Sequence, residues 1–106
     1  MNPPDMREML EKAQQMQAKV AQLQRELAVR NFEGSAGGGM VTAVATGELR
    51  ITKVSIEEQL FATGDRDMIQ DLTAAAVNAA LQTAQRTVQE EFQRISGGLA
   101  IPGMGG

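Results

Sequence analysis

The sequence of 106 residues predicts a small α+β protein with the order α-β-β-β-α, in which two long helices flank a three-stranded antiparallel sheet. Three observations predict this class. An apolar heptad runs through the first 29 residues, a glycine-rich and β-branched stretch follows, and residues 65–96 contain neither glycine nor proline. A period that changes from helical to alternating and back is typical of an α+β domain.

The first helix is predicted over residues 5–29. Pro3, Pro4 and Asp5 favour a helix start, because proline suits the first turn and an early carboxylate complements the helix dipole. Apolar side chains then follow at alternating spacings of three and four, which is a heptad pattern. They are Met6, Met9, Ala13, Met16, Val20, Leu23 and Leu27. Such a helix is about 37 Å long and has one narrow apolar stripe, so we expect a coiled-coil-like arm with the methionines packed in a core. The alternative is that exposed methionines form an adaptable binding groove.

The middle of the chain predicts a three-stranded antiparallel meander between about residues 29 and 56. A weak first strand is expected over Val29–Glu33 and a stronger one over Met40–Thr46, with the Gly34–Gly39 loop between them. Gly47 and Glu48 supply a hairpin turn. The alternation in 49–56 changes phase near Lys53, which indicates a β-bulge there. We expect one face of this sheet to pack on helices.

The second helix is predicted over residues 65–96. A short helical turn is expected first at Glu57–Phe61, and Thr63-Gly64-Asp65 then offers an N-cap. Small apolar residues at helical spacing, including Ala76, Ala80 and Ala84, predict a close approach to another element. Gly97 and Gly98 end the helix. The sequence thus predicts a single domain over 1–98 and a flexible glycine-rich tail over 99–106.

The predicted helix lengths bear on the oligomeric state. A compact 106-residue domain has a diameter of roughly 35 Å, whereas a 32-residue helix is about 48 Å long. The two helices therefore project as arms or cross into a second chain, and both arrangements favour a dimer. A second helix broken into two packed pieces is the alternative.

The composition argues against an enzyme. The chain has no Cys, His, Trp or Tyr, which removes thiol and imidazole chemistry and the usual transition-metal ligands. No nucleophile or phosphate-loop motif is present, so no catalytic residue, metal site, cofactor or small-molecule substrate is predicted. No apolar run approaches the roughly 20 residues that span a bilayer, and the N-terminus lacks the features of a signal peptide. We therefore expect a cytoplasmic protein that makes no membrane contact.

Four segments in order resemble the YbaB/EbfC family of bacterial nucleoid-associated proteins. They are Lys12–Gln17, the Gly34–Gly39 loop with Met40-Val41-Thr42 and the Gly47 hairpin, Asp67–Ala80, and the glycine-rich C-terminus with Leu99 and Pro102. The resemblance covers nearly the whole chain from about residue 8. It implies an intertwined tweezer-like homodimer that binds DNA without a cofactor, organises or protects the nucleoid and modulates gene expression.

Basic side chains are the candidate phosphate ligands, and those of the helical arms are Arg7, Lys12, Lys19, Arg25, Arg86 and Arg94. The net charge of −3 at pH 7 argues mildly against a nucleic-acid partner. A structural alternative is that Lys12 and Lys19 flank a helical interface and pair with nearby glutamates. Candidate residues for helix and dimer packing are Met9, Met16, Val20, Leu23, Leu27, Val44, Ile51 and Leu72.

Two functions from different classes follow. The first is a homodimer that binds double-stranded DNA through its arms in the cytoplasm, on the nucleoid. The second is a protein-interaction or holdase-like clasp that uses the same arms on polypeptides. The acidic isoelectric point of about 4.9 and the methionine-rich stripe favour the second, and the family resemblance favours the first.

Overall fold

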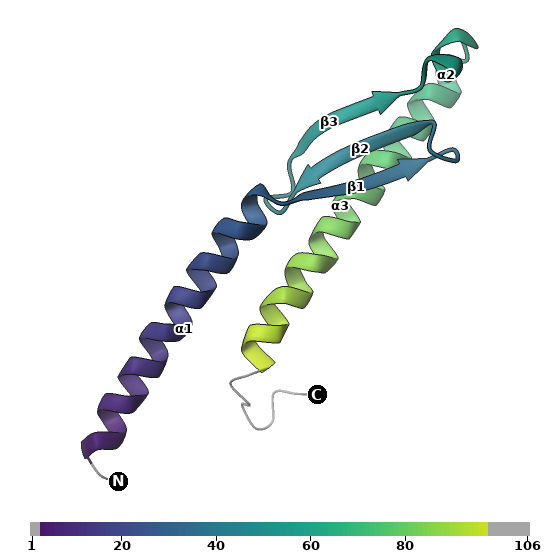
Figure 1. Cartoon of the computed structure of the whole chain (residues 1–106). Helices are drawn as coiled ribbons and strands as arrows, with labels where there is room; N and C mark the ends of the chain where they lie inside the picture. The colour runs from purple at the N-terminus through teal and green to yellow at the C-terminus, as the bar shows by residue number, and fades with distance from the viewer. Residues whose placement is uncertain (1–2, 98–106) are drawn as a thin grey trace.

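The computed structural model describes residues 3–97 and has the predicted α-β-β-β-α order, with a short extra helix before the last one (Figure 1). The elements are α1 (Pro3–Val29), β1 (Asn31–Ala36), β2 (Val41–Thr46), β3 (Ile51–Ile56), α2 (Glu58–Ala62) and α3 (Arg66–Gly97). The predicted tail over 99–106 lies outside the described residues.

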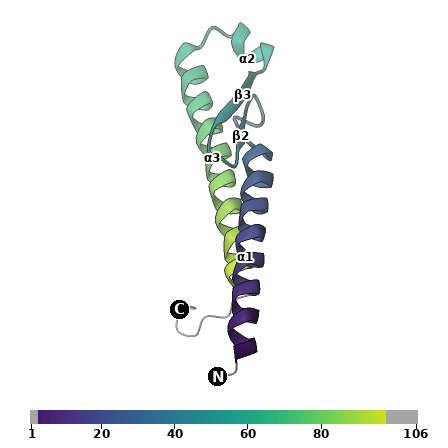
Figure 2. The same cartoon turned by 90° about the vertical axis from the view of Figure 1, so that its left-hand side faces the viewer.

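The molecule is elongated rather than globular. It measures 73 × 27 × 15 Å, and its Cα radius of gyration is 20.6 Å. A compact domain of this length has a radius of gyration of about 13 Å. α3 is one continuous helix of 32 residues, so the alternative of a helix broken into packed pieces is wrong. α1 and the second half of α3 run antiparallel away from the sheet, as Figures 1 and 2 show, and we call this pair the arm.

The sheet is an antiparallel meander in the order β1-β2-β3. Val44 pairs with Lys53 but Ala45 pairs with Ile51, so Thr52 is the extra residue of a bulge. The bulge predicted near Lys53 is confirmed. The first strand was predicted too early, since Val29 is the last residue of α1 and β1 begins at Asn31. The helical pattern extends to this point because the Arg30 N–H still donates to the Leu27 carbonyl oxygen at 3.2 Å.

The core lies between α3 and one face of β1 and β2. Alternate strand residues are buried there, among them Phe32, Val41 and Ala43. They meet Ala76, Ala80 and Ala84, which are fully buried and recur every four residues of α3. Gly34 lies where the strand touches the helix backbone, because a Cβ on Gly34 would stand only 2.6 Å from the Ala76 carbonyl oxygen. The predicted small-residue stripe is therefore the seam between helix and sheet.

The start of α3 is capped as predicted. The Asp65 carboxylate accepts a hydrogen bond from the Met68 N–H at 3.0 Å, and the Thr63 hydroxyl accepts one from the Asp65 N–H at 3.2 Å. An Asp side chain at this position satisfies an amide that has no partner inside the helix. α2 precedes the cap and buries Leu60. This corner fixes where α3 begins, and hence how far its other end reaches along the arm.

Within residues 3–97, only the C-terminal end of α1 is anchored to other elements. Leu27 is buried, and Leu23 is half-buried against the core. Toward the N-terminus the same stripe is uncovered, with Met6 67 % exposed and Met9 58 % exposed. The expectation that these two methionines pack in a core is wrong for the single chain. The physical reason is that α1 extends past the end of α3, so no element within residues 3–97 covers them (Figure 1).

Candidate nucleic-acid interface

The six candidate phosphate ligands all lie on the arm and are all exposed. Four belong to α1 and two to the second half of α3, and the two helices bring them to the same end of the molecule (Figure 1). Long side chains on an exposed helical arm can reach ligand phosphates without rearrangement of the fold. The arm is thus the place where the chain gathers cations away from its core.

These cations do not form one line. Lys12 and Lys19 are seven residues apart and share a face of α1 that borders the apolar stripe. Arg7 and Arg25 are 18 residues apart, which is about five helical turns, so they share another face. α1 therefore presents two basic lines along its length. A rod with cations on two sides can contact phosphates on both strands bordering a groove, or on two duplexes.

Most of the arm cations make no ion pair within the described residues. Over residues 3–97 the structure has one ion pair, in which Arg94 lies 3.4 Å from the Glu91 carboxylate. The Arg94 side chain is 76 % exposed, and such pairs contribute little to stability. Neither Lys12 nor Lys19 pairs with a glutamate there, so the structural alternative of salt-bridged lysines is not what the described chain shows. Their charges are available to an external anion.

The negative charge of the chain is concentrated at the end opposite the arm tip. Residues 57–71, which form α2 and the start of α3, contain five acidic side chains and one basic one, whereas the remaining residues carry a net charge of +1. Figure 1 places α2 at the far end of the molecule from the first residues of α1. The protein is therefore acidic overall, although its arm has no net negative charge. Sequence segments alone did not reveal this, because the polarity exists only once the elements are placed in space.

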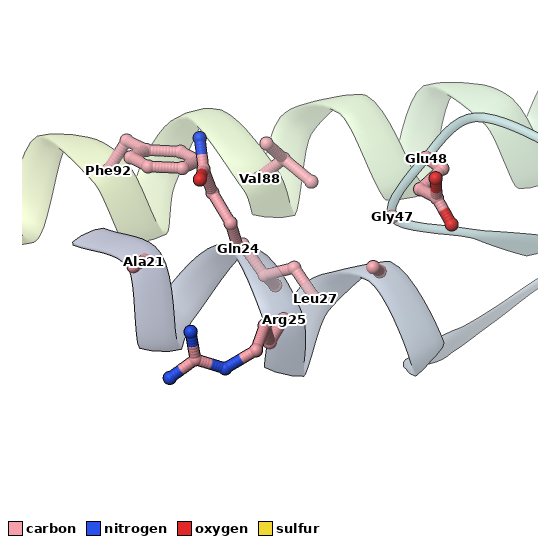
Figure 3. Close-up of a pocket in the computed structure, with 9 residues that line it drawn as sticks. Ala21, Gln24, Arg25, Leu27, Gly47, Glu48, Val88 and Phe92 are labelled. Carbon is pink, nitrogen blue, oxygen red and sulfur yellow. The ribbon is translucent and has the colours of Figure 1, made fainter. Parts of the chain in front are cut away.

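A groove of about 470 Å³ separates α1 from α3 next to the β2–β3 hairpin. Its lining includes Leu27, Val88 and Phe92, and Figure 3 shows Gln24 reaching toward Phe92 while the Arg25 side chain points away from α3. Glu48 is the one acidic residue in the lining. The groove is a packing seam of the arm and directs Arg25 outward.

The predicted packing residues divide into two groups. Leu27 is in the core, and Leu23, Ile51 and Leu72 are half-buried against it. The others are not part of that cluster: Met16, Val20 and Val44 are half-buried, and Met9 is exposed. Val44 lies on the sheet face turned away from α3, because it alternates with the buried Ala43 and Ala45. The second group is open to contacts outside this chain.

Two features are absent from the described residues. No helix there is long and apolar enough to cross a membrane. No cluster of three or more acidic, His or Cys residues that could hold a metal ion occurs in the part of the chain that the structure describes.

The site thus lies on an α-β-β-β-α domain whose two-helix arm carries exposed Lys and Arg side chains. The chain belongs to the YbaB/EbfC DNA-binding family, whose sequence pattern matches residues 1–99.

Relatives of this chain are named nucleoid-associated proteins. One from Acetivibrio thermocellus is 43 % identical over 97 residues, covering 91 % of this chain and 86 % of the relative. One from Caldanaerobacter subterraneus is 40 % identical over 96 residues, with the same coverage. One from Pelotomaculum thermopropionicum is 40 % identical over 100 residues, covering 94 % of this chain and 95 % of the relative.

A solved structure shares the fold. The crystal structure of an uncharacterized Helicobacter pylori protein superposes with a TM-score of 0.59 and covers 93 % of this chain and 97 % of its own. The sequence identity is 19 %, so this likeness supports the fold alone.

Proposed function

We propose that two copies of this chain form a homodimer that binds double-stranded DNA through the basic side chains of the arms. The observation that carries the proposal is the set of exposed arm cations without an ion pair in residues 3–97: Arg7, Lys12, Lys19, Arg25 and Arg86. Together with Arg94 they form the interface. The protein acts in the cytoplasm, on the nucleoid, where it organises or protects DNA and modulates gene expression. It performs no chemical reaction and needs no cofactor.

The distribution of charge supports this mode of binding. The acidic residues 57–71 form an acidic pole at one end of the molecule, whereas the arm is near-neutral and carries exposed Lys and Arg side chains. This separation of charge makes the molecule dipolar, so the field of a duplex orients the arm toward DNA. Contacts of Lys and Arg with phosphates carry no sequence information directly, so the binding is largely sequence-independent. Double strands are the expected target, because the chain has no Tyr or Trp on which unpaired bases could stack.

The incomplete packing of the single chain supports a homodimer. Val54 on β3 is 40 % exposed although it shares the sheet face that α3 covers elsewhere. β3 also has one unpaired edge, since it ends the strand order. A second copy can cover these surfaces and set two arms against one duplex, which doubles the number of phosphate contacts.

The test is a fluorescence-anisotropy titration of a labelled duplex of about 30 base pairs at about 50 and 200 mM salt. Each neutralised phosphate contributes roughly 0.9 to the slope of log affinity against log salt, so four contacts weaken binding about 150-fold over this range. Saturable binding with such a slope supports the proposal. Absence of binding at low salt by a chain confirmed as a dimer contradicts it.

A polypeptide clasp is the second candidate function. The exposure of Met6, Met9 and Leu10 favours it, because flexible apolar side chains at the end of an arm suit varied protein surfaces. Failure of the DNA titration would make this candidate the leading one.

A further inference from the structure

The uncovered apolar stripe at the end of α1 forms a shallow groove. Met6, Met9, Leu10 and Ala13 line a hollow of about 290 Å³. The stripe continues the one that packs against α3 nearer the sheet, since Met9 and Ala13 keep the heptad spacing of Leu23 and Leu27. Within residues 3–97 nothing covers it. The apolar stripe of α1 therefore continues beyond the end of α3, which covers the part of the stripe near the sheet.

The end of α3 can be placed along α1. Ile95 lines a small groove together with Lys19 and Leu23, so it lies beside the turn between them. α3 ends two residues later at Gly97. Counted along α1 from Lys19, which lies level with the end of α3, Leu10 is about 14 Å and Met6 about 20 Å nearer the N-terminus, at 1.5 Å per residue. Gly97 thus lies beside α1 where the uncovered stripe begins.

The residues after Gly97 have the length and chemistry to cover the stripe. Residues 98–106 carry no charged side chain, and Leu99, Ile101 and Met104 are large and apolar. Pro102 excludes a continued helix and favours an extended path for Ile101. Seven extended residues, 98–104, span about 23 Å, which is enough to pass Leu10 and reach Met6.

We propose that the segment Leu99–Met104 lies along the groove formed by Met6, Met9, Leu10 and Ala13 of the same chain. The same chain is favoured over a second copy because a segment tethered about 14 Å from its site has a high effective concentration there. Docking completes the heptad seam to the end of the arm and orders the helical turns that carry Arg7 and Lys12. The proposal does not depend on DNA binding.

The chain itself offers a clean test, because Met104 lies in the docking segment and Met6 and Met9 line the groove. The methionine methyl groups carry ¹³C. Docking places the Met104 methyl group against the groove, so we expect nuclear Overhauser contacts between it and the Met6 or Met9 methyl group. Met68 is the internal control, since it lies near the opposite end of α3, about 44 Å along the helix from Gly97. No such contact should join it to Met104.

Two additions make the outcome decisive. The double substitution Leu99→Ser with Ile101→Ser should abolish these contacts, whereas the matched Ala100→Ser should keep them. Dilution of the ¹³C-labelled chain in a large excess of unlabelled native chain should leave the contacts in place. Absence of contacts from Met104 to Met6 and Met9 would overturn the proposal in favour of an undocked tail. Contacts that disappear on dilution would overturn it in favour of a tail donated by a second copy.

Discussion

The backbone N–H of Gly47 donates a hydrogen bond of 3.0 Å to the carbonyl oxygen of Leu27. This bond joins the last turn of α1 to the β2–β3 hairpin, and the same carbonyl oxygen also accepts the hydrogen bond from the Arg30 N–H. The contact is so close that a Cβ on residue 47 would stand 2.6 Å from the carbonyl carbon of Leu27. The direction in which α1 leaves the sheet is therefore set at this point.

Gly47→Ala is expected to destabilise the protein by about 1–3 kcal/mol, because the new methyl group must push the end of α1 away from the hairpin. Urea unfolding at one fixed protein concentration measures the change. Glu48→Ala is the control, since Glu48 is the exposed neighbour in the same turn. Equal unfolding midpoints for the two variants would show that the end of α1 is not held at this contact.

Reversal of the charges of Lys12 and Lys19 to Glu is expected to weaken binding to every duplex tested. Four cations are lost per homodimer, so the salt slope should fall by up to about 3.6. Arg66→Glu is a control with the same kind of charge change, because Arg66 lies in the acidic segment at the other end of the molecule. An unchanged titration for the lysine variant would move the interface to Arg30, Arg50 or Lys53 around the sheet.

Removal of the α3 cap is expected to cost about 1 kcal/mol in Asp65→Ala, since the Met68 amide loses its acceptor. Asp65→Asn keeps a side-chain acceptor and should lie within a few tenths of a kcal/mol of the native chain. Urea unfolding separates the two variants. If both lost the same stability, the carboxylate charge rather than the hydrogen bond would be responsible.

Sedimentation at micromolar concentration is expected to give twice the chain mass of 11.3 kDa. The reason is that Val54 and the outer edge of β3 have no cover within the described single chain. A species at the mass of one chain would contradict the homodimer.

Deletion of residues 99–106 is expected to leave the cooperative thermal unfolding transition in place. The core of the described chain lies between α3 and the sheet, far from the arm tip. Circular dichroism at a helix band follows the transition, and only fraying of the first turns of α1 should be added. Loss of the transition would show that the tail belongs to the core.

Local patterns in the sequence predicted most of the fold. The absence of glycine and proline over 65–96 placed α3 to within one residue, and the change of phase in β3 located the bulge. The first strand was misplaced because Val29 favours strands by propensity, yet the end of α1 holds it in the helix. The heptad likewise predicted the apolar stripe on α1. It did not predict which element covers the stripe, because that depends on where α3 ends along α1.

The candidate site was predicted less completely. Helical spacing shows that Lys12 and Lys19 share a face, and the structure adds that neither makes an ion pair within residues 3–97. The acidic pole around α2 could not be read from segment charges, because it depends on α2 folding back at the end of the molecule opposite the arm.

The joint between Gly47 and Leu27 makes α1 a lever. The helix has 27 residues and is about 40 Å long, and within residues 3–97 only its C-terminal part packs against other elements. A rotation of about 10° at the joint displaces the far end by about 7 Å, which is two base-pair steps of 3.4 Å along B-form DNA. Small adjustments of the backbone angles beside the hairpin therefore decide which phosphates the Lys and Arg side chains of α1 contact. A rigid core of α3 and the sheet can in this way fit duplexes of differing curvature.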